Sequence, residues 1–89
     1  MENKVLIKLF VPEIDENFDV FIPVNEITWK IKKMLIKSVS DLTGADIDVS
    51  KEFVLINKTT TKIYNNNEII INTDIRNGTE LIIISRKEG

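Results

Sequence analysis

The residues that most constrain the architecture of this chain are Ile75-Arg76-Asn77-Gly78-Thr79-Glu80-Leu81-Ile82-Ile83-Ile84-Ser85. Asn77-Gly78 is a strong turn signal, because glycine tolerates a positive φ angle. The run that follows it is rich in β-branched residues and free of proline, which predicts a strand with apolar side chains on both faces. Such a strand is typical of the middle of a sheet, often beside a parallel neighbour. The earlier chain must therefore supply flanking strands and a cover for at least one face.

Length and composition indicate one small domain. The 89 residues contain neither cysteine nor histidine, so thiolate chemistry is excluded and the commonest general base is missing. A net charge of -2 argues against a general nucleic-acid binder, since such proteins usually carry a positive excess. No segment approaches the roughly 18 apolar residues that a membrane span needs, and no signal-peptide layout is present. We expect a single domain over residues 1–89, ordered at about 4–85, that is cytoplasmic and not inserted in a membrane.

The apolar pattern predicts a hairpin, then a helix, then short strands. Residues 4–11 and 18–22 alternate between the two faces of a strand and are joined by an acidic turn-forming loop. Residues 26–43 switch to a period of 3.6, with Asn25 as the expected N-cap and Gly44 as the C-terminal cap. Residues 53–56 and 63–64 are expected as strands, and residues 69–71 as a short apolar insert. The expected core stripe of the helix is Ile27, Ile31, Met34, Leu35, Ser38 and Leu42, with Val39 at its edge.

This order of elements predicts a β-grasp fold of the α+β class. In that fold one helix packs across one face of a mixed sheet, here of four to five strands, and the first and last strands lie parallel and side by side. A central position for the last strand explains why residues 81–84 show no polar alternation.

The segment Ile70-x-x-x-x-Ile75-x-Asn77-Gly78-x-x-Leu81, with Ile63-Tyr64 before it and Ile27 and Ile31 on the helix, resembles ubiquitin-like proteins. Over roughly residues 4–85 the chain is most similar to the small YukD/EsaB-like members that accompany WXG100, or type VII, secretion systems of Gram-positive bacteria. The resemblance implies a non-catalytic accessory component. Its implied partner is a membrane-associated part of the secretion apparatus, at the cytoplasmic face.

Two other functions stay open. An activated ubiquitin-like modifier or sulfur carrier needs a C-terminal Gly-Gly, whereas this chain ends Arg86-Lys87-Glu88-Gly89. YukD-like proteins also lack the di-glycine and are regarded as non-conjugating, so this departure fits them. The other alternative is a subunit of an unrelated complex.

Side chains that could carry other chemistry are sparse. The loop acids Glu13, Asp15 and Glu16, and likewise Asp41, Asp46 and Asp48, lack the spacing of a calcium loop and are expected to be solvated. Lys30, Lys33 and Lys37 line one side of the helix and are expected to form a solvated face. We therefore expect no catalytic residue, metal or cofactor, and no nucleic-acid partner.

Two apolar features are candidate contact surfaces. If alternate residues of the hairpin and the last strand face the helix, pleating turns five large apolar side chains outward. They would form a contiguous patch on the order of several hundred Å², which predicts a protein partner or a homodimer. Trp29, with Ile36 two turns along, is expected opposite the core stripe, although Trp29 also fits a hydrophobic staple with Val24. The candidate contact residues are Leu6, Phe10, Phe21, Ile82 and Ile84 on the sheet, and Trp29 and Ile36 on the helix.

Overall fold

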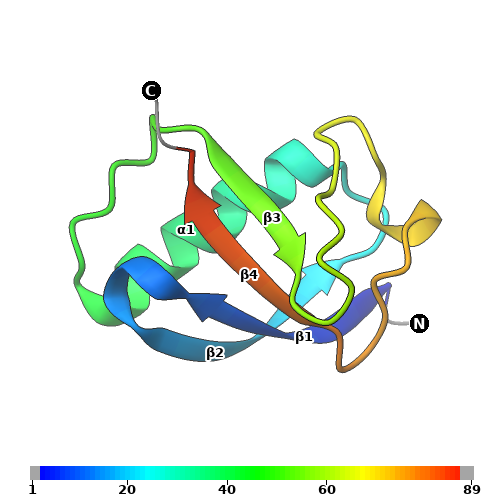
Figure 1. Ribbon diagram of the computed structural model, residues 1–89, viewed down its shortest axis with the longest axis horizontal. Coiled ribbons are helices and arrows are strands. Elements are labelled where there is room, and N and C mark those ends of the chain that lie inside the picture. The colour runs from blue at the N-terminus through cyan, green and yellow to red at the C-terminus, as the bar shows by residue number, and fades with distance from the viewer. Residues whose placement is uncertain (1–2, 87–89) are drawn as a thin grey trace.

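The computed structural model describes residues 3–86, which form a four-stranded sheet with one helix lying across one face (Figure 1). The strands are ordered β2-β1-β4-β3, with β1 and β4 parallel and the other two pairings antiparallel. This arrangement confirms the predicted β-grasp fold. The C-terminal residues 87–89, where a Gly-Gly would lie, are outside the described residues. The elements are β1 (Lys4–Val11), the 3₁₀ helix η1 (Pro12–Ile14), β2 (Glu16–Pro23), α1 (Thr28–Thr43), β3 (Phe53–Asn57), the 3₁₀ helix η2 (Ile70–Asn72) and β4 (Glu80–Ser85).

The Asn77-Gly78 turn places β4 beside β1. Gly78 has a φ angle of 86°, the left-handed conformation that glycine tolerates. Its amide donates to the carbonyl of Leu6 at 2.7 Å, and the Leu6 amide donates to Asn77 Oδ1 at 2.8 Å. These two bonds join the turn to β1, so that β4 begins in register with it.

The core lies between α1 and the sheet. The inward residues of β1, β2 and β4 are the ones that the alternation predicts, and Val5, Phe18 and Val20 pack against the core while staying partly exposed. The strand phase taken from the sequence is therefore confirmed. The buried apolar residues are Ile7, Leu9, Val11, Ile22, Ile31, Leu35, Ile36, Val39, Phe53, Leu55, Tyr64, Ile70, Ile75, Leu81 and Ile83.

The helix begins at Thr28, two residues later than predicted. Ile27 is the N-cap, in an extended conformation and without a side-chain hydrogen bond, so the expected cap at Asn25 is wrong. The physical reason is a long-range pairing: Ile27 bridges to Ile69, and the Thr28 amide donates to the carbonyl of Glu68 at 2.8 Å. Carbonyls of a distant loop thus accept hydrogen bonds from the first amides of the helix, which a capping side chain would otherwise accept. The other end agrees with prediction, since Gly44 is left-handed and its amide donates to the carbonyl of Ser40.

The buried stripe of α1 is also rotated from the prediction. Its buried residues include Ile36 and Val39, whereas Leu42 in the last turn is 71% exposed. Ile36 was expected on the exposed side of the helix, and that expectation is wrong because the segment leading into β3 covers it. The 3.6-residue period of apolar residues located the helix, but it could not show on which side of the helix the segment before β3 would pack.

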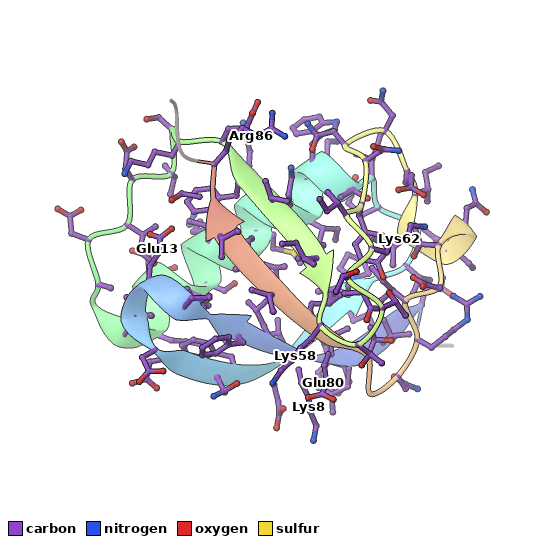
Figure 2. The ribbon with its side chains drawn as sticks, in the orientation of Figure 1. Lys8, Glu13, Lys58, Lys62, Glu80 and Arg86 are labelled. Carbon is purple, nitrogen blue, oxygen red and sulfur yellow. The ribbon has the colours of Figure 1, made fainter. Side chains whose placement is uncertain are left out.

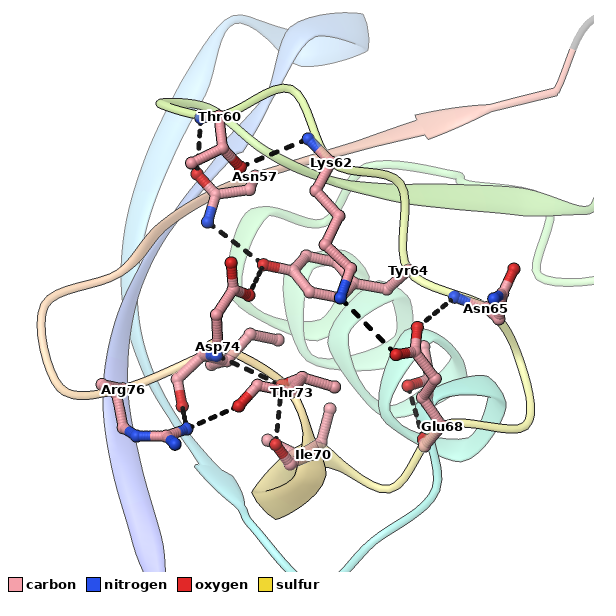
Figure 3. A network of polar contacts seen from close by, with 12 residues as sticks. Asn57, Thr60, Lys62, Tyr64, Asn65, Glu68, Ile70, Thr73, Asp74 and Arg76 are labelled. Carbon is pink, nitrogen blue, oxygen red and sulfur yellow. Dashed lines mark hydrogen bonds and ion pairs between the residues drawn. The ribbon is translucent and has the colours of Figure 1, made fainter.

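The chain between β3 and β4 has little regular structure and is joined by side-chain hydrogen bonds (Figure 3). The predicted strand at residues 63–64 is reduced to a single bridge between Ile56 and Ile63, and residues 70–72 form η2. Buried Tyr64 accepts a hydrogen bond from Asn57 Nδ2 at 3.1 Å and donates one to Asp74 Oδ1 at 2.5 Å. Polar side chains thus add to the short backbone pairing of residues 62–64 with β3.

Within residues 3–86, no helix is both long enough and apolar enough to cross a membrane.

Candidate interaction surface

The sheet face turned away from α1, called the outer face below, is turned toward the viewer in Figure 1. All five predicted sheet residues lie on it: Phe21 is 63% exposed, and the other four are partly buried. In the register, Leu6 pairs with Phe21 across β1 and β2, and Phe10 pairs with Ile82 across β1 and β4. The five residues are Leu6, Phe10, Phe21, Ile82 and Ile84.

A charged row divides this face. Lys8 on β1 pairs with Asp19 on β2 and with Glu80 on β4, and Lys58, just after β3, lies beside Glu80. The signs alternate along the row, and Lys58 Nζ lies 3.9 Å from Glu80 Oε1. Figure 2 shows Lys8, Lys58 and Glu80 gathered at one edge of the view. The expectation of one contiguous apolar patch is therefore wrong, because Lys8 stands between Leu6 and Phe10 on β1 and the register sets Asp19 and Glu80 on either side of it.

On one side of the charged row lies a group of five partly buried apolar residues, called the β4 patch. Ile82 pairs with Ile56 and Ile84 pairs with Val54 across the β3–β4 ladder. Pleating turns one alternate pair of residues 53–56 toward this face, but alternation alone does not say which pair. The β4 patch consists of Phe10, Val54, Ile56, Ile82 and Ile84.

On the other side of the row, Leu6 and Phe21 form a separate apolar pair. Strand geometry puts each of them about 7 Å from the charged residue two positions along its strand. A shallow hollow of about 360 Å³ lies along the row and reaches Phe10, whose ring centroid is 5.9 Å from Lys58 Nζ. A partner covering the whole outer face must therefore satisfy charges between two apolar contacts.

Glu13 holds the C-terminal end of β4, next to Ile84. Its Oε1 accepts a hydrogen bond from the Ser85 amide at 2.9 Å, across 72 positions of sequence. Hydrogen bonds from Ser85 lower the pKa of the Glu13 carboxyl below its usual value. Turn residue Glu13 thus has a structural role that its position in an acidic loop did not indicate.

Trp29 and Ile36 lie on the helix, in the layer opposite the outer face. Because Ile27 is the N-cap, Trp29 is the second helical residue, and the two staple positions belong to Glu26 and Ile31. The hydrophobic staple of Val24 with Trp29 is therefore wrong. Trp29 is 38% exposed and Ile36 is 1% exposed, so only Trp29 presents a large surface to solvent.

Within the described residues, no group of three acidic side chains is placed to hold a metal ion. The polar clusters that do form are hydrogen-bonded to neighbouring backbone, as Asp48 is to the Ser50 amide at 2.9 Å. The outer face can therefore bind through apolar contact and paired charges.

Solved structures share this fold at low sequence identity. No protein-family model matches the chain, and no curated protein matches it. The N-terminal ubiquitin-like domain of the 4931431F19Rik protein matches with a TM-score of 0.69 and 18% identity, over 100% of this chain and 81% of that one. A chain of the MycP5-free ESX-5 inner membrane complex matches with a TM-score of 0.77 and 16% identity, over 98% of this chain but only 22% of that one. A chain of the toluene 4 monooxygenase HD complex matches with a TM-score of 0.76 and 6% identity, over 93% of this chain and 99% of that one. These likenesses show the ubiquitin-like β-grasp fold.

Proposed function

We propose that this chain is a non-catalytic protein-interaction module that binds a protein partner through the outer face of its sheet. The observation that carries the proposal is the β4 patch, where five large apolar side chains from three strands stay partly exposed on the face that α1 leaves uncovered. Because each of them is already partly buried, covering the rest would contribute less than the roughly 1.5 to 3 kcal/mol of a full burial. Aromatic residues dominate interface energetics, so Phe10 is the expected anchor of the patch and Phe21 that of the separate pair.

The proposed context is a WXG100, or type VII, secretion system. Two observations support it: the resemblance of roughly residues 4–85 to YukD/EsaB-like proteins, and the likeness in fold to one part of an ESX-5 inner membrane complex chain. In this proposal the module is an accessory component in the cytoplasm. Its partner is a membrane-associated component of the apparatus.

The test measures binding of Ile84→Asp and Phe21→Asp variants to the cytoplasmic segments of secretion components encoded beside its gene. Each variant places a carboxylate in one apolar part of the outer face, and we expect loss of complex in calorimetry or pull-down with an unchanged circular dichroism spectrum. Leu42→Asp is the matched control, because this exposed apolar residue lies on α1.

Sizing of the same variants separates partner binding from self-association. A wild-type homodimer that Ile84→Asp converts to a monomer would assign the outer face to a second copy of this chain. If both variants stay folded and every association persists, the outer face is not the working surface. Should Ile84→Asp unfold, the milder Ile84→Ser and Val54→Ser variants carry the same test.

A further inference from the structure

A second hollow lies on the helix side of the molecule, between α1 and the segment that enters β3. It measures about 270 Å³ and is called the Trp29 groove. Trp29, Lys33 and Ile36 follow one another along α1 at spacings of four and three residues, which places them on one side of the helix. The opposite wall comes from the segment before β3 and its first residue. The residues that define the groove are Trp29, Lys33, Ile36, Val49, Lys51 and Phe53.

The apolar part of the groove has a buried floor and exposed rims. Ile36 and Phe53 are buried, whereas Trp29 is 38% exposed on the helix and Val49 is 56% exposed on the facing segment. Two large apolar side chains thus remain open to solvent on opposite walls of one hollow. A single apolar side chain entering between them would be enclosed from both sides.

The charges around this hollow are mainly positive. The ammonium groups of Lys30 and Lys33 lie 5.5 Å and 5.4 Å from the centroid of the Trp29 ring. Lys30 pairs with Glu26 at 3.8 Å and Glu52 pairs with Arg86 at 3.4 Å. Among residues 3–86, Lys33 has no ion-pair partner within 4 Å, and Lys51 also has none at that distance, although its charge acts on the nearby carboxylates of Glu13 and Asp48. The chain as a whole carries a net charge of -2, so this surface is locally opposite in sign to the protein.

The backbone edge beside the groove is already occupied. Lys32 Nζ donates to the carbonyl of Phe53 at 2.6 Å, and the amide of Tyr64 donates to the carbonyl of Leu55 at 3.0 Å. An incoming strand would have to displace these bonds to extend the sheet at β3. Recognition at this place is therefore through side chains.

We propose that the Trp29 groove binds an acidic peptide segment of a partner protein that presents one large apolar side chain flanked by carboxylates. The apolar side chain packs between Trp29 and Val49, and the carboxylates meet Lys33 and Lys51. A peptide fits better than a nucleic acid, because the apolar walls of the hollow suit an apolar side chain, whereas nucleic-acid binding depends mainly on contacts to phosphates. This site is independent of the outer face, which lies on the other side of the sheet.

Trp29 is the single tryptophan of the chain, so its fluorescence reports on this groove directly. The probe is the synthetic peptide acetyl-Glu-Asp-Asp-Leu-Glu-Asp-amide. We expect a saturable change in emission that weakens as salt rises from about 50 mM to about 500 mM, since exposed charge pairs are screened. Two matched peptides, one with serine in place of leucine and one with lysine in place of every acid, are expected to bind about tenfold more weakly or not at all.

The variant Lys33→Glu with Lys51→Glu is expected to lower the affinity for the acidic peptide by about tenfold or more. Its control is Lys4→Glu with Lys37→Glu, which makes the same change in net charge at two exposed residues that line neither the groove nor the charged row, and it is expected to bind nearly as the wild type does. The proposal is overturned if both double variants are folded and weaken peptide binding equally, or if the wild type gives no saturable response. Tighter binding of a single-stranded oligonucleotide than of the acidic peptide would also overturn it. Ile84→Asp is expected to leave the fluorescence response to the peptide unchanged. The experiment therefore distinguishes a wrong proposal for the groove from a wrong proposal for the outer face.

Discussion

The Tyr64 hydroxyl donates a hydrogen bond to Asp74 Oδ1 at 2.5 Å, and this contact joins two parts of the irregular segment between β3 and β4 (Figure 3). The same hydroxyl accepts from Asn57 Nδ2, at the end of β3. Asn57 Oδ1 in turn accepts the amides of Thr59 and Thr60. Tyr64 therefore connects the last residue of β3 to the segment that leads into β4.

Replacing Tyr64 by phenylalanine is expected to lower the free energy of unfolding by about 1 to 3 kcal/mol. The ring still fills its buried site, but Asn57 Nδ2 loses its acceptor in a place with little access to water. Urea denaturation measures the loss. Asp74→Asn, which keeps an acceptor oxygen for the Tyr64 hydroxyl, is the control and is expected to cost less; a Tyr64→Phe protein as stable as the wild type would contradict this role.

Stability is also expected to fall at high pH because of Tyr64. Burial, together with the hydrogen bond to Asp74, raises the pKa of Tyr64 to about 12 from its ordinary value of 10.0. Between these values the unfolded chain loses the phenolic proton while the folded protein keeps it, so stability decreases as pH rises through this window. Denaturation at pH values across the window is expected to show a decline in wild type that exceeds the decline in Tyr64→Phe. Parallel curves for the two proteins would exclude this coupling.

Gly78→Ala is expected to destabilise the protein by about 1 to 2 kcal/mol through backbone strain alone. The φ angle at Gly78 is 86°, and no atom of a residue beyond its two chain neighbours lies within 4 Å of where the new Cβ would be, so no clash with the rest of the protein adds to the strain. Gly78→Asn is expected to cost less, because asparagine tolerates the left-handed conformation. Thermal melts of both variants test the order, and an alanine variant at least as stable as the asparagine variant would refute it.

Ile31→Ala is expected to cost about 2 to 4 kcal/mol, because it removes a fully buried aliphatic group from α1, the one helix of residues 3–86 that covers the sheet. Trp29→Ala is expected to cost on the order of 1 kcal/mol, since its ring is partly exposed and does not serve as a staple. Equal losses in urea denaturation would assign Trp29 to the core instead of to the groove.

Much of the fold was predictable because its signals are local. The alternation of Val5, Ile7 and Leu9 identifies the buried face of β1, and the apolar run of β4 indicates a central strand. The long-range contacts left weaker signals. Nothing near Asn25 indicates that the carbonyl of Glu68 accepts a hydrogen bond from the first amide of α1. Likewise, nothing near Glu13 indicates that its carboxylate accepts a hydrogen bond from the Ser85 amide.

By itself, the sequence determined the hairpin, the helix and the central last strand, the inward and outward alternation of β1, β2 and β4, and the positions of the turns at Gly44 and Gly78. Each of these depends on side-chain period or on the backbone freedom of one residue, which are properties of neighbours along the chain. Only the tertiary structure decided that Lys8 lies between Asp19 and Glu80, and that Ile36 is covered by the segment entering β3. Strand register and the packing of one element on another depend on pairings between residues far apart in sequence, because the free energy of those contacts is realised only when the whole sheet and its helix are assembled.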